Sequence, residues 1–138
     1  MQVDFTHKTT LRVRYGETDQ MGYCYYGNYA QYFEMGRTEW LRELGITYKN
    51  MEESGIMLPV INLNTNYIKP AKYDDILTLK TTLIKRPSAK IEFAFEIHNK
   101  NEELLTTAKA TLVFVNMATN KPTRAPKYIM DIIDKIMN

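Results

Sequence analysis

The sequence predicts an α+β protein in which one long helix packs against an antiparallel sheet. A long amphipathic pattern at helical spacing occupies residues 28–44. Four segments with strand patterns follow it in residues 57–116, and turn-rich stretches join them. Strands joined by hairpins run antiparallel, so the helix has to bury its apolar side on the sheet that they form.

The composition is that of an ordinary soluble protein. The chain has 138 residues, of which 44% are hydrophobic and 25% charged. A chain of this length can fold without a disulfide or a metal, and we expect a single domain over residues 1–138. The net charge of +2 is small and the basic residues are scattered, which argues against a nucleic-acid partner.

Cys24 is the only cysteine, so no disulfide can form within the chain, and no Cys/His pattern has zinc-ligand spacing. We therefore expect no metal and no cofactor. Residues 1–10 lack the apolar core of a secretory signal. The longest apolar run is far shorter than the roughly 20 residues that span a bilayer. A cytoplasmic protein without a membrane span is the expectation.

The first predicted element is a strand at Thr9–Tyr15. Its apolar side chains alternate with polar ones and should share a buried face: Leu11, Val13 and Tyr15. The following residues, 16–27, are rich in glycine and tyrosine and are predicted to form an irregular loop.

The long helix should begin at Asn28, whose side-chain oxygen can cap the first turn, and end near Leu44. Gly45 fits the left-handed position that follows many helices. Gly36 inside the helix costs roughly 1 kcal/mol relative to alanine, so we expect it at a close contact with the sheet. The apolar side of the helix comprises Tyr29, Phe33, Gly36, Trp40 and Leu44.

Shorter patterns complete the chain. A helical turn is predicted at Tyr48–Glu53 and a terminal helix at Ala125–Met137. The four strands are predicted at Met57–Ile68, Ile76–Ile84, Ala89–His98 and Leu104–Asn116. The small side chains of Ala108 and Ala110, like Gly36, should let the helix and the sheet approach closely. In the first of these strands, Ile61, Leu63, Thr65 and Tyr67 share one face, and Asn62, Asn64 and Asn66 share the other.

Asp19 lies in the glycine-rich loop just before the long helix. Aspartate is common in turns, which would explain it structurally. A functional explanation also exists, because a helix N-terminus presents unpaired N–H groups and a partial positive charge. Such donors can hold a developing oxyanion, and losing one typically costs about 2.7–4 kcal/mol of barrier. A carboxylate beside them, with the N–H groups of residues 26–28, would supply an acyl-transfer site.

Three stretches of the chain resemble a known enzyme family. They are Arg14–Leu41 (RYGETDQMGYCYYGNYAQYFEMGRTEWL), Asn66–Asp75 (NYIKPAKYDD) and Lys121–Pro126 (KPTRAP). Together they are similar to the 4-hydroxybenzoyl-CoA thioesterase family, and more narrowly to the acyl-CoA thioesterases associated with the Tol–Pal system. Many of the Tol–Pal-type relatives carry histidine where this chain has Tyr26.

The resemblance implies a hotdog fold, in which a curved antiparallel sheet wraps around one long helix. It implies hydrolysis of an acyl-CoA thioester to a carboxylic acid and free CoA. Asp19 matches the catalytic carboxylate, as nucleophile or general base, and the backbone N–H of Tyr26 matches the group that polarises the carbonyl. The family also forms homodimers or homotetramers with active sites at the subunit interface.

Several residues are candidates for contact with the acyl-CoA substrate. Gly27 and Asn28 stand at the helix entry, although Asn28 also fits a cap. Asn64 belongs to an asparagine-rich strand face that is either an exposed edge or the border of a wet cleft. Lys85 and Arg86, just before a proline, are the best candidates for the CoA phosphates.

Other functions remain open from the sequence. Cys24 could be a nucleophile, but no histidine is close in sequence, and a buried, inert cysteine fits better. Glu17, in the Glu-Thr-Asp motif, is expected to accept hydrogen bonds within the loop. A hotdog dehydratase would be expected to have a histidine near the helix entry, and none lies between His7 and His98. The sequence is also compatible with an acyl-carrier-protein thioesterase and with a non-catalytic acyl-CoA binding protein.

Overall fold

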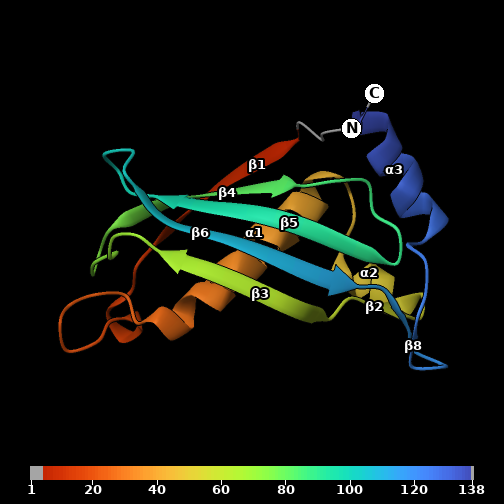
Figure 1. Ribbon diagram of the computed structural model, residues 1–138, viewed down its shortest axis with the longest axis horizontal. Coiled ribbons are helices and arrows are strands. Elements are labelled where there is room, and N and C mark those ends of the chain that lie inside the picture. The colour runs from red at the N-terminus through yellow and green to blue at the C-terminus, as the bar shows by residue number, and fades with distance from the viewer. Residues whose placement is uncertain (1–4, 138) are drawn as a thin grey trace.

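The computed structural model describes residues 5–137, which form a curved antiparallel sheet with a long helix against one face (Figure 1). The sheet has the strand order β1-β4-β5-β6-β3. Its strands are β1 (Thr6–Arg12), β3 (Val60–Tyr67), β4 (Ile76–Leu83), β5 (Lys90–His98) and β6 (Leu104–Val113). A second, three-stranded sheet joins β2 (Ile56–Met57), β7 (Val115–Asn116) and β8 (Lys121–Pro122). The predicted α+β class is confirmed.

Three α-helices accompany the sheets in this part of the chain: α1 (Tyr29–Glu43), α2 (Tyr48–Glu53) and α3 (Lys127–Met137). Helix α1 buries an apolar side against the sheet, where Phe33 packs on Phe95 and Trp40 packs on Phe93. It ends as predicted, because Gly45 has a φ of +81° and its N–H bonds to the carbonyl of Arg42 at 2.9 Å.

Gly36 marks a close approach of α1 to the sheet. A Cβ atom built on it would lie 2.5 Å from Thr81 Oγ1 and 2.7 Å from Leu79 Cδ2. The predicted close contact is confirmed. Gly36 faces β4 rather than Ala108 and Ala110 of β6, because α1 lies over the β1, β4 and β5 side of the sheet.

The first strand lies three residues earlier than predicted, at Thr6–Arg12 rather than Thr9–Tyr15. Val13 is buried as expected, but its N–H bonds to the carbonyl of Asp75 outside the strand. The chain then enters a 3₁₀ turn at Tyr15–Glu17. Tyr15 is therefore 78% exposed instead of sharing the buried face.

Two predicted strands are each divided between the two sheets. The segment predicted at Met57–Ile68 breaks at Leu58 and Pro59, because proline has no N–H for a sheet ladder. The segment predicted at Leu104–Asn116 breaks at Phe114. The short strands β2 and β7 pair with each other beyond these breaks.

Strand β3 forms one edge of the large sheet and is poorly covered. Leu63 stands opposite Ala110 of β6, on the α1 side of the sheet, and Asn64 stands opposite Lys109, on the outer side. Helix α1 packs mainly against β1, β4 and β5 and meets β3 through Tyr29, whose ring centroid lies 5.4 Å from that of Tyr67. The inner apolar side chains of β3 therefore remain largely open: Ile61, Leu63 and Tyr67 are 51%, 39% and 53% exposed.

Helix α3 packs beside the end of the sheet where β4 connects to β5 (Figure 1). Its inner face buries Ile129 and Ile133, and Arg86 binds Asp134 through two hydrogen bonds of 2.8 and 3.1 Å. None of the helices in residues 5–137 combines the length and the apolar character that crossing a bilayer requires.

Candidate active site

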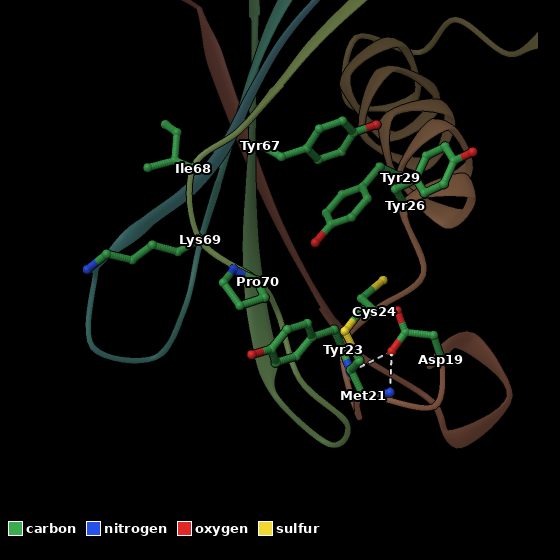
Figure 2. Close-up of a pocket in the computed structure, with 10 residues that line it drawn as sticks. All are labelled: Asp19, Met21, Tyr23, Cys24, Tyr26, Tyr29, Tyr67, Ile68, Lys69 and Pro70. Atoms are coloured by element: carbon green, nitrogen blue, oxygen red, sulfur yellow. Dashed lines mark hydrogen bonds between the residues drawn. The ribbon is translucent and has the colours of Figure 1, made fainter.

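Asp19 stands in a tight loop that closes between Thr18 and Cys24. Its Oδ1 atom accepts hydrogen bonds from the backbone N–H groups of Met21 (2.9 Å) and Tyr23 (3.2 Å), as Figure 2 shows. The other carboxylate oxygen, Oδ2, has no hydrogen-bond partner within residues 5–137. The loop therefore fixes the carboxylate through one oxygen and leaves the second free to act.

The entry to α1 is a 3₁₀ turn at Tyr26–Asn28. The N–H of Tyr25 bonds to the carbonyl of Glu17 at 2.8 Å, and the N–H of Asn28 bonds to the carbonyl of Tyr25 at 2.9 Å. Between them, the N–H groups of Tyr26 and Gly27 find no acceptor in the described part of the chain. Two backbone donors are thus available where the sequence predicted them.

Asn28 does not cap the helix as predicted. Its backbone is already helical, with φ of −80° and ψ of −18°, and its side chain makes no cap hydrogen bond. Instead its Nδ2 group donates to the carbonyl oxygen of Glu17 at 2.7 Å. With its N–H also engaged, Asn28 ties the helix entry to the loop and has no free backbone donor for a substrate.

Glu17 is buried, with 8% of its surface exposed, and its carboxylate is fully engaged. Its Oε1 accepts from the N–H of Arg14 (2.8 Å) and the hydroxyl of Tyr32 (3.0 Å), and its Oε2 accepts from Arg14 Nη2 (3.0 Å). Burial raises the pKa of this carboxyl, but the hydrogen bonds and charge of Arg14 and the Tyr32 bond outweigh it, so the net pKa lies below the ordinary value. The role expected for Glu17 as a loop acceptor is confirmed.

A pocket of about 400 Å³ opens between the Asp19 loop, the α1 entry and the end of β3. It is lined by Asp19, Met21, Tyr23, Cys24, Tyr26, Tyr29, Tyr67, Ile68, Lys69 and Pro70. Figure 2 shows the rings of Tyr26, Tyr29 and Tyr67 grouped at one end, with the Asp19 loop at the other. The ring centroids of Tyr29 and Tyr67 are 5.4 Å apart, so the two aromatic residues form a continuous apolar wall.

The residues from Tyr67 to Pro70 were not predicted as site residues. Their main sequence signal was their place in the family-like stretch Asn66–Asp75. They enter the pocket because Ile68 and Lys69 both bond to the carbonyl of Leu105, which bends the chain after β3. The Nζ of Lys69 binds Glu103 at 2.7 Å, and Figure 2 shows this side chain directed away from Asp19 and the tyrosines.

Cys24 lines the pocket but is 6% exposed, and its Sγ lies 3.4 Å from the Tyr32 hydroxyl. Burial raises the pKa of its thiol, which keeps it protonated. No histidine lines the pocket that could activate it. In residues 5–137, no three His, Cys, Asp or Glu side chains are close enough together to hold a metal ion.

The other predicted substrate contacts are not brought to this pocket. Asn64 lies on the outer face of the sheet, opposite Lys109. Lys85 and Arg86 follow the last residue of β4, at the opposite end of that strand from the Asp19 loop (Figure 1). There Lys85 pairs with Glu92 at 3.2 Å, and Arg86 is held by Asp134. The eight residues of β4 correspond to roughly 27 Å of strand.

The curved sheet with a long helix against one face is the architecture of hotdog-fold thioester hydrolases. The chain belongs to the thioesterase-like superfamily, whose sequence profile matches residues 13–133. Among curated proteins it is 34% identical over 124 residues to YneP of Bacillus subtilis, named as a candidate acyl-CoA thioesterase, with 90% of each chain covered. It is 32% identical over 120 residues to the acyl-CoA thioesterase YbgC of Haemophilus influenzae, covering 86% of this chain and 88% of the relative.

A solved structure agrees with these relatives. The DHNA-CoA thioesterase of Staphylococcus aureus superposes with a TM-score of 0.89 at 36% identity, covering 95% of this chain and 90% of the other. The predicted hotdog fold, the thioesterase family and the class of thioester hydrolase are confirmed by these matches.

Proposed function

We propose that this protein hydrolyses an acyl-CoA thioester in the pocket beside Asp19. One observation carries the proposal: Asp19, whose Oδ2 is free, and Tyr26, whose N–H is unpaired, line the same pocket, and the unpaired N–H of Gly27 comes next along the chain. A base or nucleophile and an oxyanion site are the two parts that acyl transfer needs. Asp19 and Tyr26 are the proposed catalytic groups, and Gly27 is the second donor to the substrate.

The two N–H groups would act on the thioester carbonyl oxygen. As the carbonyl carbon becomes tetrahedral, negative charge collects on that oxygen, and fixed backbone dipoles stabilise it without reorganising. Each such donor typically lowers the barrier by about 2.7–4 kcal/mol. Because thioesters are intrinsically reactive, two donors and one carboxylate form a sufficient set.

Asp19 can complete the reaction by either of two routes. As a general base it takes a proton from water, the hydroxide attacks the carbonyl carbon, and the C–S bond breaks to release the CoA thiolate. As a nucleophile its oxygen attacks the same carbon, the thiolate leaves, and water hydrolyses the resulting anhydride. A single turnover in heavy-oxygen water separates the routes, because only the anhydride route can place solvent oxygen in the Asp19 carboxylate.

The aromatic wall supports an acyl group of apolar or aromatic character. Tyr26, Tyr29 and Tyr67 offer ring faces and edges to a planar group. The name of the S. aureus relative gives a concrete candidate, DHNA-CoA. A panel of substrates measures which acyl chain length the enzyme prefers and whether it prefers aromatic acyl groups.

The panel consists of acyl-CoA thioesters from acetyl to palmitoyl, with benzoyl-CoA and DHNA-CoA, and released thiol is measured. Matched acyl-carrier-protein thioesters test the carrier. We expect turnover by the wild type, and a kcat at least about 100-fold lower for Asp19→Asn. Asp131→Asn, on the exposed side of α3, is the matched control. Absence of turnover on every thioester, or full activity of Asp19→Asn, would contradict the proposal.

We also propose that the protein is a homodimer or homotetramer that joins copies along β3. This edge strand is unpaired on one side and exposes Ile61, Leu63 and Tyr67 on its inner face. An open apolar edge of this kind is an aggregation hazard unless another chain covers it. Tyr67 and Ile68 border the pocket, so a second copy placed there would help to enclose the active site.

A cytoplasmic location is proposed from the unpaired Cys24 and from the acyl-CoA substrate.

A further inference from the structure

The Asp19 loop is anchored to the rest of the molecule on two sides. On one side, the N–H of Cys24 bonds to the carbonyl of Ala71 at 2.8 Å, and Tyr23 pairs with Lys72. This anchor holds the loop against the segment that precedes β4. The backbone bonds of this anchor do not reach the α1 entry, which carries the two free N–H donors, although Cys24 Sγ lies 3.4 Å from the Tyr32 hydroxyl further along α1. A separate connection must therefore set where Asp19 stands relative to those donors.

Glu17 provides that connection, because it contacts the base of the loop, the helix entry and the helix itself. Its carbonyl oxygen accepts from the N–H of Tyr25 (2.8 Å) and from Asn28 Nδ2 (2.7 Å), on either side of the two free donors. Its side chain accepts from the hydroxyl of Tyr32, one turn into α1. Thr18, the next residue, is the first residue of the loop that carries Asp19.

The burial of this carboxylate requires a specific reason. A buried carboxylate is costly unless its oxygens are well bonded, and Glu17 meets this condition with three side-chain hydrogen bonds. A hydrophobic residue would fill the same space at lower cost, but it could not bind Tyr32 and Arg14 together. The hydrogen bonds of this carboxylate therefore serve to lock the relative position of three segments rather than to fill the core.

We propose that Glu17 is a positioning residue, which fixes the separation between the Asp19 carboxylate and the N–H groups of Tyr26 and Gly27. The inference rests on the proposed function, because it assigns Glu17 a role that acts through Asp19. Displacement of a catalytic group by about 1 Å can cost on the order of 100-fold in rate. Loss of the Glu17 bonds should therefore lower kcat more than it raises KM.

The test is a double-mutant cycle of wild type, Glu17→Ala, Asp19→Asn and the double variant, using the panel thioester with the highest kcat/KM. We expect Glu17→Ala to lower kcat by about 10- to 100-fold and to change KM by less than about threefold. In the Asp19→Asn background, the same change should lower the residual kcat by less than about twofold. Equal losses in both backgrounds would overturn the inference, since a merely structural defect does not depend on Asp19.

Two further variants test whether the hydrogen bonds of Glu17 cause the effect. Glu17→Gln keeps an oxygen that can accept from Tyr32 and from the N–H of Arg14, so we expect it to retain kcat within about threefold of wild type. Glu43→Ala, an exposed change on the last turn of α1, is the control for loss of a glutamate and should leave kcat unchanged. A Glu17→Gln variant as impaired as Glu17→Ala would overturn the hydrogen-bond explanation.

The outcomes separate this inference from the proposed function. Full activity of Asp19→Asn defeats the proposed catalysis, whereas normal kcat in Glu17→Ala with an inactive Asp19→Asn defeats only the positioning role. If no thioester is hydrolysed, amide hydrogen exchange is measured instead. Unchanged protection of the backbone amides of residues 18–28 in Glu17→Ala would then overturn the inference. If Glu17→Ala does not fold, Tyr32→Phe removes one bond and keeps the ring, and its kcat loss should likewise disappear in the Asp19→Asn background.

Discussion

Gly36 of α1 lies so close to Thr81 of β4 that a Cβ atom on the glycine would be 2.5 Å from the threonine Oγ1. The long helix can therefore approach the sheet only where it lacks a side chain. The glycine costs the helix about 1 kcal/mol through lost propensity. Its position along β4 fixes where the N-terminal end of α1 meets the Asp19 loop.

Replacement of Gly36 by alanine should destabilise the fold. Overpacking typically costs about 1–3 kcal/mol, and the gain in helix propensity offsets roughly 1 kcal/mol of it. We expect a net loss of up to about 2 kcal/mol in the free energy of unfolding, measured by urea denaturation. Gln31→Ala, on the exposed side of the same helix, is the control and should be nearly neutral. A Gly36→Ala protein more stable than wild type would contradict the close contact.

Thr81→Val should leave the fold equally or more stable. Thr81 Oγ1 is buried and has no hydrogen-bond partner within residues 5–137. An unpaired buried hydroxyl costs about 1–3 kcal/mol, and valine has nearly the same shape without it. We expect the free energy of unfolding to rise by up to about 1 kcal/mol. Thr82→Val, which breaks the 2.8 Å contact between the Thr82 and Thr6 hydroxyls, should give no such gain.

Asn28→Asp distinguishes a tether from a helix cap. In a cap, aspartate replaces asparagine at little cost, because either side chain offers an oxygen. Asn28 instead donates through Nδ2 to the Glu17 carbonyl, and an aspartate would place a carboxylate against that oxygen. We expect Asn28→Asp to lower the free energy of unfolding by about 1–3 kcal/mol, as measured by urea denaturation. Thr47→Asp is the matched control, because Thr47 does accept a cap bond from the N–H of Asn50, and it should be nearly neutral.

The charge of Glu17 should make stability depend on pH in a defined direction. Its pKa in the folded protein lies below the ordinary value of about 4.3, so the folded state favours the ionised form. The stabilisation is therefore present above the unfolded pKa and is lost as the pH falls through the folded pKa. The groups around the carboxylate are Arg14, Tyr32 and Cys24, and of these Arg14 alone is charged in this range.

Denaturation of wild type and Glu17→Gln at several pH values measures this effect. The variant cannot ionise at this position, so the stability difference isolates the carboxyl. We expect the free energy of unfolding of the wild type to exceed that of Glu17→Gln by a constant amount near neutral pH. This difference should shrink between about pH 5 and pH 3. An advantage that grows as the solution is acidified would reverse the assigned direction of the pKa.

Leu63→Asp should disrupt self-association. Leu63 is 39% exposed at the β3 edge in the single chain, so a charge there is tolerated until a second copy covers it. We expect sedimentation to shift toward the monomer and kcat/KM to fall with it. Asn64→Asp, on the outer face of the same strand, should retain the wild-type assembly. An oligomer that survives Leu63→Asp would place the interface elsewhere.

Local sequence patterns determined most of the architecture. The spacing of Phe33 and Trp40, and Gly45 at its end, defined α1, because an amphipathic helix has one period and a recognisable C-terminal signal. The alternation in Ala89–His98 gave β5 almost to the residue. The glycine-rich loop with Asp19 before a helix predicted a carboxylate beside free N–H donors, since a helix start always leaves such donors.

Other features depended on contacts between distant segments. Nothing in the alternation of Thr9–Tyr15 shows that Val13 leaves the sheet to bond Asp75, and a proline's effect on Met57–Ile68 depends on which strands it would have joined. The basic pair Lys85 and Arg86 looked suited to phosphates, but it lies at the far end of β4 from Asp19 and is paired with acidic residues there.

The sequence alone therefore determined the fold class, the α1 entry and the place of Asp19 in the loop before it, because each is encoded over a few neighbouring residues. Only the tertiary structure decided which groups surround that carboxylate. Tyr67 reaches the pocket from β3, and Tyr32 reaches Glu17 from α1, through approaches that local propensity does not encode. Packing of the sheet against the helix sets these distances, and packing depends on all the segments at once.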